Sequence, residues 1–345
     1  MKEVKIGLVG LGNLGKLHLF HLQNKVAGAK VIAICDMDEK RLAEAQEEFN
    51  VEHAYTDYHE MISNPDLDAV VLVTNVGAHK EQCIAAAEKG LNIFCEKPLA
   101  HTLEECYEIE RAVEKNKGKV FQIGFMQRSD PSYVDMKKKV DAGVIGKPFM
   151  FKDVRHDPST HLAFQLELVK TGGYTPWFCE MGIHGMDSML WFMDSELESV
   201  YAIGGAYVEP GFAEYDDYDN AYALFKFKDG TCGYLEVGRT HVCAHHVHTE
   251  VVGTKGTMRL NNVPNRTRVE VFNADGLLTE LEPTYLERWV PAYIAELEDF
   301  VLAINGEKEP PSTVYDGAKS LKMYMMTQKA YVENRKVTAD EIDTE

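Results

Sequence analysis

The sequence predicts two domains: an α/β domain built on a doubly wound parallel sheet, and an α+β domain with a large open, mostly antiparallel sheet. Three observations predict this organisation. The chain has 345 residues, enough for two domains with separate cores. Apolar strand patterns alternate with helical patterns in the first third, as in a doubly wound sheet. Beyond it, strands dominate, so we place the domains at residues 1–123 and 124–345.

The first domain begins with a strand, a glycine turn and a helix. Residues 4–9 form a short apolar run rich in β-branched side chains, which is typical of a buried parallel strand. Residues 13–23, after the turn, have the apolar spacing of a helix. Further strands are predicted at residues 31–35, 69–74, 91–95 and 120–124, and further helices at 38–49, 58–63, 80–89 and 103–115.

The second domain is predicted to consist mainly of strands. Helices are expected at residues 131–142, 177–193, 285–304 and 315–334, and the last two can pack back on the first domain. Strands are expected at residues 148–155, 199–207, 220–227, 233–237, 249–252 and 267–272. Hairpin turns such as Lys228-Asp229-Gly230 connect some of them.

The glycine turn is the first candidate for a functional site. It reads Gly10-Leu11-Gly12-Asn13-Leu14-Gly15 and lies between a predicted strand and a predicted helix. Gly10 permits the tight turn, Gly12 lets backbone N–H groups approach a pyrophosphate, and Gly15 lets the helix pack closely on the strand. This is the fingerprint of a dinucleotide-binding Rossmann domain.

The second predicted strand ends in Asp36, about 20 residues after the last glycine, where a ribose-binding acid is expected. A carboxylate there accepts hydrogen bonds from the ribose hydroxyls and repels a 2′-phosphate. We therefore predict NAD, rather than NADP, as the cofactor. Arg41 is predicted to point to solvent from the following helix. We also expect Thr74, Asn75 and His79 to contact the cofactor.

The composition excludes several functional classes. A net charge of −19 argues against nucleic-acid and anionic-membrane partners, which bind basic surfaces. No apolar run approaches the roughly 18 residues of a spanning helix, and no apolar leader follows Met1. The seven cysteines lack metal-ligand spacing. We therefore expect a cytoplasmic protein with reduced thiols and no metal.

Two later motifs supply candidate chemistry. Lys97, in Glu96-Lys97-Pro98, follows a buried strand at its carboxyl end, where open α/β sheets bind ligands. Pro98 can fix the backbone there through a cis peptide bond. In the predicted helix 177–193, Glu180 and His184 are four residues apart, on one face with Asp187 and Trp191. A carboxylate one turn before an imidazole can orient it as a general base.

These motifs, in this order, resemble the glucose-fructose oxidoreductase/inositol dehydrogenase (Gfo/Idh/MocA) family, and the resemblance covers essentially the whole chain. Glu96-Lys97-Pro98 resembles that family's hallmark. The segments 124–130 and 285–289, and the pattern from Gly172-Gly173 to His184 and Asp187, are similar to its inositol dehydrogenases.

The resemblance implies roles for particular residues. Lys97 would hydrogen-bond the reacting hydroxyl and His184 would accept its proton, assisted by Glu180. This glutamate is a departure, because the family usually has an aspartate there. Glu96 and Lys97 would also contact the cofactor. The expected substrate-binding residues are Met126, Arg128, Arg155, His156, Asp157, His245 and His246.

A second departure is a histidine-rich stretch before Glu250, where the family tends to have a strand containing tyrosine. His241, His245, His246 and His248 could hydrogen-bond sugar hydroxyls, or bind a metal if an acid approached, and their role stays open. Our expectation remains that no metal is bound.

The resemblance implies NAD-dependent oxidation of a ring secondary alcohol of a cyclic polyol or sugar, of inositol type, to the ketone by a homodimer or homotetramer. An alternative keeps the same site but oxidises sugars or glycosides at C3, or uses transient C3 oxidation to act as a glycosidase. A nucleotide-sensing regulator is a third class, which the presence of both Lys97 and His184 disfavours.

Overall fold

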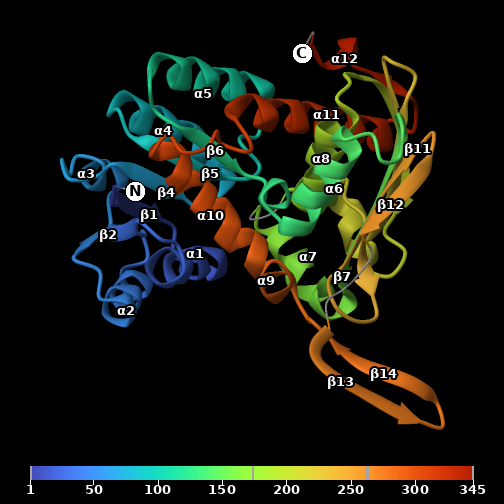
Figure 1. Cartoon of the computed structure of the whole chain (residues 1–345), viewed down its shortest axis with the longest axis horizontal. Coiled ribbons are helices and arrows are strands. Elements are labelled where there is room, and N and C mark those ends of the chain that lie inside the picture. Colours follow the sequence, from blue (N-terminus) through green and yellow to red (C-terminus); the bar gives the residue numbers. More distant parts are fainter. Residues whose placement is uncertain (1, 173–174, 261–264, 344–345) are drawn as a thin grey trace. The chain divides into compact units, whose positions relative to one another are not determined.

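The computed structural model describes residues 2–172, 175–260 and 265–343 (Figure 1). The chain forms two compact units. The first contains Met1–Pro131 and Pro291–Leu321, and the second contains Ser132–Val290 and Lys322–Glu345. Each unit has its own sheet.

The sheet of the first unit has six strands, all parallel, in the order β3-β2-β1-β4-β5-β6. This is the strand order of a dinucleotide-binding doubly wound fold, so the predicted Rossmann sheet is confirmed. Its strands are β1 Val4–Val9, β2 Ala29–Cys35, β3 His53–Tyr55, β4 Ala69–Leu72, β5 Asn92–Glu96 and β6 Phe121–Gly124. The connecting helices are α1 Asn13–Asn24, α2 Glu39–Phe49, α3 Tyr58–Met61, α4 Val76–Glu88 and α5 Leu103–Lys115.

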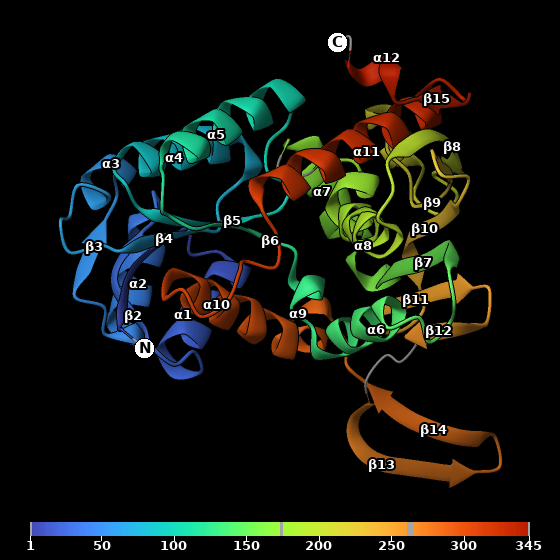
Figure 2. The same cartoon turned by 45° about the horizontal axis from the view of Figure 1, so that its top comes forward.

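Helix α10 (Val290–Ile304) completes the core of the first unit. Its Leu297, Phe300 and Val301 belong to one buried cluster with Leu8 and Phe94 of the sheet. Figures 1 and 2 show α10 with α1 on one face of this sheet and α4 with α5 on the other. Helix α10, although distant in sequence, therefore packs against β1 and β5, the strands that precede the glycine turn and Lys97.

The sheet of the second unit has seven strands in the order β12-β11-β7-β10-β9-β8-β15. Among its described strands only β7 and β10 pair in parallel, so the predicted mostly antiparallel sheet is also confirmed. Its strands are β7 Pro148–Pro158, β8 Leu197–Gly205, β9 Asn220–Phe227, β10 Cys232–His241, β11 His246–Gly253, β12 Gly256–Leu260 and β15 Val337–Thr338. Helix α8 (Ile183–Met193) packs against β7 and β10.

Several elements depart from the prediction. The helix expected at 177–193 begins with a π-helical turn, Phe178–Gly182, before α8. The helix expected at 285–304 is divided into α9 (Tyr285–Arg288) and α10. Helix α7 (Leu162–Lys170) and strand β14 (Gly276–Leu281), the partner of β13 (Asn265–Asn273), were not foreseen. The predicted motif residues Gly173 and Tyr174 lie outside the described residues.

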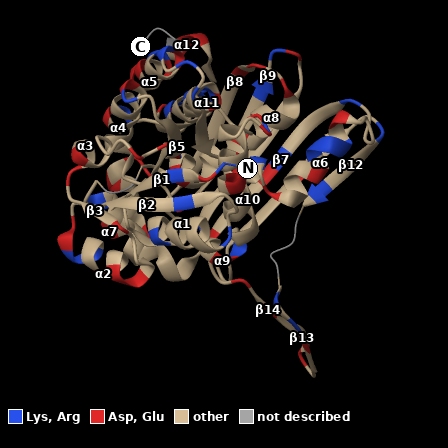
Figure 3. Ribbon diagram, turned by 60° about the vertical axis from the view of Figure 1, so that its left-hand side comes forward, with Lys and Arg blue, Asp and Glu red and all other residues tan. Residues whose placement is uncertain are grey.

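The remaining helices are α6 Pro131–Asp141, α11 Val314–Val332 and α12 Asp340–Asp343. Within the described part of the chain, no helix combines the length and apolar character needed to cross a membrane. Acidic residues outnumber basic ones, 55 to 36, and Figure 3 shows them spread over several elements, including α2 and α3.

Candidate active site

The glycine turn has the geometry that the sequence predicts. Gly10 has a φ of +89°, and a Cβ there would lie 2.3 Å from the carbonyl oxygen of Val73. A Cβ at Gly15 would lie 1.9 Å from the carbonyl oxygen of Gly10. A Cβ at Gly12 would meet nothing within 4 Å, so this position opens outward at the N-terminus of α1. The turn thus keeps space beside backbone N–H groups, which fits a dinucleotide pyrophosphate.

Asp36 is held in a fixed orientation after β2. Its Oδ2 accepts the Leu11 backbone N–H at 2.7 Å, and its Oδ1 accepts that of Asp38 at 2.9 Å. Arg41 is exposed, as expected, but it also lies beside Asp36, which was not expected. The Arg41 side chain is 44% exposed, and its Nη1 lies 3.5 Å from Oδ2 of Asp36.

The loops after β4 and β5 are joined by His79. Its Nε2 lies 3.1 Å from the carbonyl oxygen of Thr74, and its Nδ1 lies 2.9 Å from that of Pro98. Burial lowers the pKa of His79, so the neutral ring donates to only one of these carbonyls. Thr74 Oγ1 donates to Gln82 Oε1 at 2.7 Å. Asn75 precedes α4, and its side chain makes no capping hydrogen bond.

Lys97 directly follows β5, and its peptide bond to Pro98 is cis. Glu96 Oε2 accepts the Lys97 backbone N–H at 3.2 Å, while Glu96 Oε1 lies 2.8 Å from His18 Nε2. A Cβ at Gly124 would lie 2.8 Å from Glu96 Oε2, so only glycine leaves room for this carboxylate. Glu96 is therefore tightly packed, and its hydrogen bond fixes the backbone of Lys97.

Two predicted substrate-binding residues of the first unit are engaged within that unit. Arg128 donates to the carbonyl oxygen of Pro311 at 3.1 Å and to Asp316 Oδ1 at 2.9 Å. Met126 is buried in the short 3-10 turn Met126–Arg128. Arg128 thus ties this turn to the C-terminal segment of the same unit.

In the second unit, His184 is the second residue of α8 and is largely buried. A Cβ at the next residue, Gly185, would lie 2.4 Å from Asp153 Oδ2 and 2.9 Å from Arg155 Nε. Asp153 and Arg155 form a buried ion pair on β7. Burial raises the pKa of Asp153, and Arg155 partly offsets the shift. The helix carrying His184 therefore rests directly on this ion pair, and glycine is required at the contact.

Glu180 lies in the π-helical turn rather than in a continuous α-helix, which corrects the predicted helical spacing to His184. Its Oε1 accepts the Thr175 backbone N–H at 3.0 Å and the Thr175 hydroxyl at 2.8 Å. Glu180 thus fixes Thr175, which lies just before the π-helical turn. His184, Asp187 and Trp191 keep their common α-helical face because all three lie in α8.

Asp157 and His245, both predicted pocket residues, meet although 88 positions separate them. Asp157 Oδ1 lies 2.7 Å from His245 Nδ1, and the indole N–H of Trp289 donates to His245 Nε2 at 3.1 Å. Because Nε2 accepts, the neutral ring carries its proton on Nδ1 and donates it to Asp157. Gln165 donates to the other oxygen of Asp157 at 3.2 Å.

His156 and His246 lie on the opposite face of the sheet from Arg155 and Asp157. Successive residues of a strand point to opposite faces, and burial alternates along β7 accordingly. His156 Nε2 lies 2.8 Å from Glu236 Oε1. His246 pairs with His156 in the register of β7 and β11. A substrate pocket on one face of the sheet can therefore include either Arg155 and Asp157, or His156 and His246, but not both sets.

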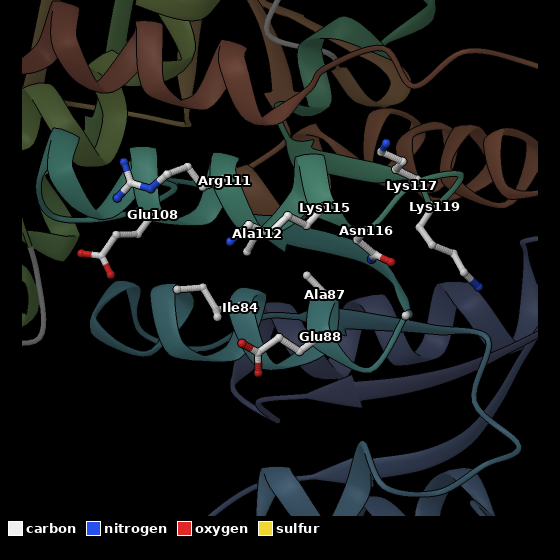
Figure 4. A pocket seen from close by; sticks show the side chains of 11 residues that line it. Ile84, Ala87, Glu88, Glu108, Arg111, Ala112, Lys115, Asn116, Lys117 and Lys119 are labelled. Atoms are coloured by element: carbon white, nitrogen blue, oxygen red, sulfur yellow. The ribbon is translucent and has the colours of Figure 1, made fainter.

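A groove of ≈ 880 Å³ lies between α4 and α5, lined by residues such as Glu88, Arg111 and Lys117 (Figure 4). It adjoins the C-terminal ends of these helices, which lead into the amino ends of β5 and β6. Ligands of open α/β sheets bind at the carboxyl ends. The groove is therefore at the wrong edge of the sheet for the cofactor.

A six-stranded doubly wound sheet with this glycine turn, and with an acid at the end of its second strand, is typical of a dinucleotide-binding domain such as that of an NAD-dependent oxidoreductase. Residues 4–125 match the family model "Oxidoreductase family, NAD-binding Rossmann fold", and residues 133–259 match "GFO/IDH/MocA C-terminal domain". The chain belongs to the Gfo/Idh/MocA oxidoreductase family, as its motifs predicted. The cofactor is NAD.

Curated relatives and solved structures resemble the chain over nearly its full length. It is 32% identical to scyllo-inositol 2-dehydrogenase (NAD(+)) of Bacillus subtilis, covering 98% of this chain and 97% of the relative. It is 31% identical to myo-inositol 2-dehydrogenase of Thermotoga maritima, covering 98% and 99%. A structure of scyllo-inositol dehydrogenase from Lactobacillus casei, with bound NAD(H) and scyllo-inositol, matches with a TM-score of 0.94 at 31% identity, covering 98% and 100%.

Proposed function

We propose that this enzyme oxidises a ring secondary alcohol of an inositol-type polyol to the ketone. The observation that carries the proposal is Lys97, which is supported by Glu96 at the ligand-binding edge of an NAD-binding sheet. The similarity to two inositol 2-dehydrogenases over 98% of the chain supports a cyclic polyol as the substrate. We assign the chemistry to residues as follows.

Lys97 donates a hydrogen bond to the reacting hydroxyl through its ammonium group and so lowers the hydroxyl pKa. His184 accepts the hydroxyl proton as general base. NAD⁺, when bound, supplies the hydride acceptor. Glu180 acts through the backbone, because its carboxylate holds Thr175, which precedes the π-helical turn that leads into the His184 helix.

The remaining predicted contacts divide into two groups. Asp36 binds the adenosine ribose, and the Gly12 opening receives the pyrophosphate, with Asn13 and Leu14 at the start of α1 beside it. On the α8 side of the second sheet, Arg155, Asp157 and His245 are the candidates for shaping the polyol pocket. We further propose a cytoplasmic homodimer or homotetramer.

The test is a panel of inositols, free sugars and glycosides with NAD⁺ and NADP⁺, following the absorbance of the reduced nicotinamide. We expect the highest kcat/KM with an inositol and NAD⁺. Preference for a glycoside would favour oxidation at C3. Release of the aglycone without net NADH would mean that the enzyme is a glycosidase. Either result would contradict the proposal.

A further inference from the structure

Three buried side chains of the first unit meet beside the lysine motif. They are His18 of α1, Glu96 of β5 and Glu296 of α10, exposed by 0%, 6% and 1%. One polar side-chain atom of each lies within 4.8 Å of the others. His18 Nε2 and Glu96 Oε1 are 2.8 Å apart, which is a hydrogen-bond distance. Two buried carboxylates are thus packed together with one imidazole.

Glu296 differs from its two neighbours. Neither of its carboxyl oxygens has a hydrogen-bond partner among the described residues. Burial, together with the negative charges of Glu96 and Asp299, raises the pKa of Glu296 well above its ordinary value. An ionised Glu296 would therefore be a buried, unpaired charge, the most costly state for a carboxyl group.

The surrounding cations do not compensate Glu296. Lys308 is engaged by Asp299, with its Nζ 2.5 Å from Oδ1. His21, on the same helix as His18, has its pKa lowered to about 4 by burial and by His18, so it carries no charge near neutral pH. Among the described residues of α1, β5 and α10, the titratable groups around the cluster include His18, His21, Glu96 and Asp299, and Tyr293, whose ring packs against that of His18. Of the two histidines, His21 therefore supplies Glu296 with no positive charge near neutral pH, and the Nε2 of His18 is directed at Glu96.

We propose that Glu296 keeps its proton in the folded enzyme and is a positioning residue, which lets His18 hold Glu96 in the place where it supports Lys97. With its proton on Nε2, His18 donates to Glu96 Oε1, while Glu96 Oε2 accepts the Lys97 backbone N–H at 3.2 Å. A second negative charge on Glu296 would repel Glu96 from this position. The role in catalysis rests on the function proposed for Lys97.

The first test measures stability and needs no substrate. Urea unfolding of wild type, Glu296→Gln and Glu298→Gln is followed from about pH 5 to about pH 9. A group whose pKa is raised on folding contributes stability that is lost as pH rises toward its folded pKa. Relative to Glu296→Gln, the unfolding constant of wild type should therefore rise by up to about tenfold per pH unit above the ordinary glutamate range.

Glu298 is exposed on the same helix, so Glu298→Gln should run parallel to wild type. Glu296→Met, which removes the polar atoms at similar volume, should lose the same pH slope as Glu296→Gln. Parallel curves for wild type and Glu296→Gln would overturn the proposal. So would a rise in the wild-type Tm with ZnCl₂ or MnCl₂ that Glu296→Gln abolishes, because a cation would then occupy the cluster.

The second test is kinetic and separates positioning from stability alone. As pH rises, the kcat of wild type should fall because Glu296 loses its proton. The kcat of Glu296→Gln should stay constant over the same range, and KM for NAD⁺ should be the same in both. If the kcat–pH profiles of wild type and Glu296→Gln coincide, the proton on Glu296 has no effect on the position of Lys97. If no polyol is turned over at all, the function proposed above fails. The stability test still shows whether Glu296 is protonated in the folded enzyme.

Discussion

Arg41 lies with its Nη1 3.5 Å from Oδ2 of Asp36, and its Nη2 lies 3.6 Å from Oδ2 of Asp38. The residue assigned to the adenosine ribose is therefore already beside a guanidinium, which is the group that binds phosphates best. In the wild type, the Asp36 carboxylate lies beside Arg41, and we expect its negative charge to repel a 2′-phosphate.

This arrangement predicts a cofactor switch. Asp36→Ser should remove the repulsion and release Arg41 toward a 2′-phosphate. We expect kcat/KM with NADP⁺ to rise by about 10- to 100-fold, as the gain of one charged hydrogen bond implies, and kcat/KM with NAD⁺ to fall. Steady-state kinetics with both cofactors measure this. Adding Arg41→Ala to Asp36→Ser should abolish the gain, and an unchanged NAD⁺ preference in Asp36→Ser would refute the role of Asp36.

A second prediction concerns the contact between α8 and β7. Gly185→Ala would place a Cβ 2.4 Å from Asp153 Oδ2, so the helix must shift. We expect the free energy of unfolding to fall by about 1–3 kcal/mol, the usual cost of overpacking, and activity to fall with it, because His184 is the adjacent residue.

Gly77→Ala is the matched control for Gly185→Ala. A Cβ at Gly77 would meet only His101 Nε2, at 3.6 Å, which is ordinary van der Waals contact. This change should leave stability unchanged or increase it by up to about 1 kcal/mol, the helix preference of alanine over glycine. Equal urea unfolding curves for Gly185→Ala and wild type would mean that α8 does not rest tightly on the ion pair.

A third prediction concerns the hydrogen bond between Asp157 and His245. Removing either partner leaves one buried polar atom unpaired, either Oδ1 of Asp157 or Nδ1 of His245, so Asp157→Ala and His245→Ala should each cost about 1–3 kcal/mol of unfolding free energy. Because they share one interaction, the double variant should cost less than the sum, with a coupling of about 0.5–3 kcal/mol. The double-mutant cycle in urea measures this. Strictly additive effects would show that the pair does not form in solution.

The parts of the fold that the sequence predicted well depend on local signals. The Rossmann strands are short apolar runs, and the glycine turn and Asp36 have a spacing set by one strand–helix–strand unit. Lys97 follows its strand directly. The position of each of these residues in the sheet is determined almost entirely by its neighbours in the sequence.

The remaining features depend on contacts between distant segments. Trp289, His245 and Asp157 are joined across 44 and 88 positions, and no local pattern marks them as partners. Glu296 lies in the charged stretch Glu296-Leu297-Glu298-Asp299, which suggests an exposed face, yet it is buried against Glu96. The π-helical turn at Glu180 has no recognised local sequence signal either. Only the tertiary structure reveals these features.

The most direct test of the central claim is the turnover of Lys97→Ala and His184→Ala with an inositol and NAD⁺. If Lys97 activates the hydroxyl and His184 accepts its proton, each variant should lose about 10²- to 10⁴-fold in kcat, the usual contribution of a general acid or base, while NAD⁺ binding by fluorescence titration survives. Lys117→Ala, in the groove between α4 and α5, is the control and should behave as wild type. Near-normal turnover in either Lys97→Ala or His184→Ala would contradict the account.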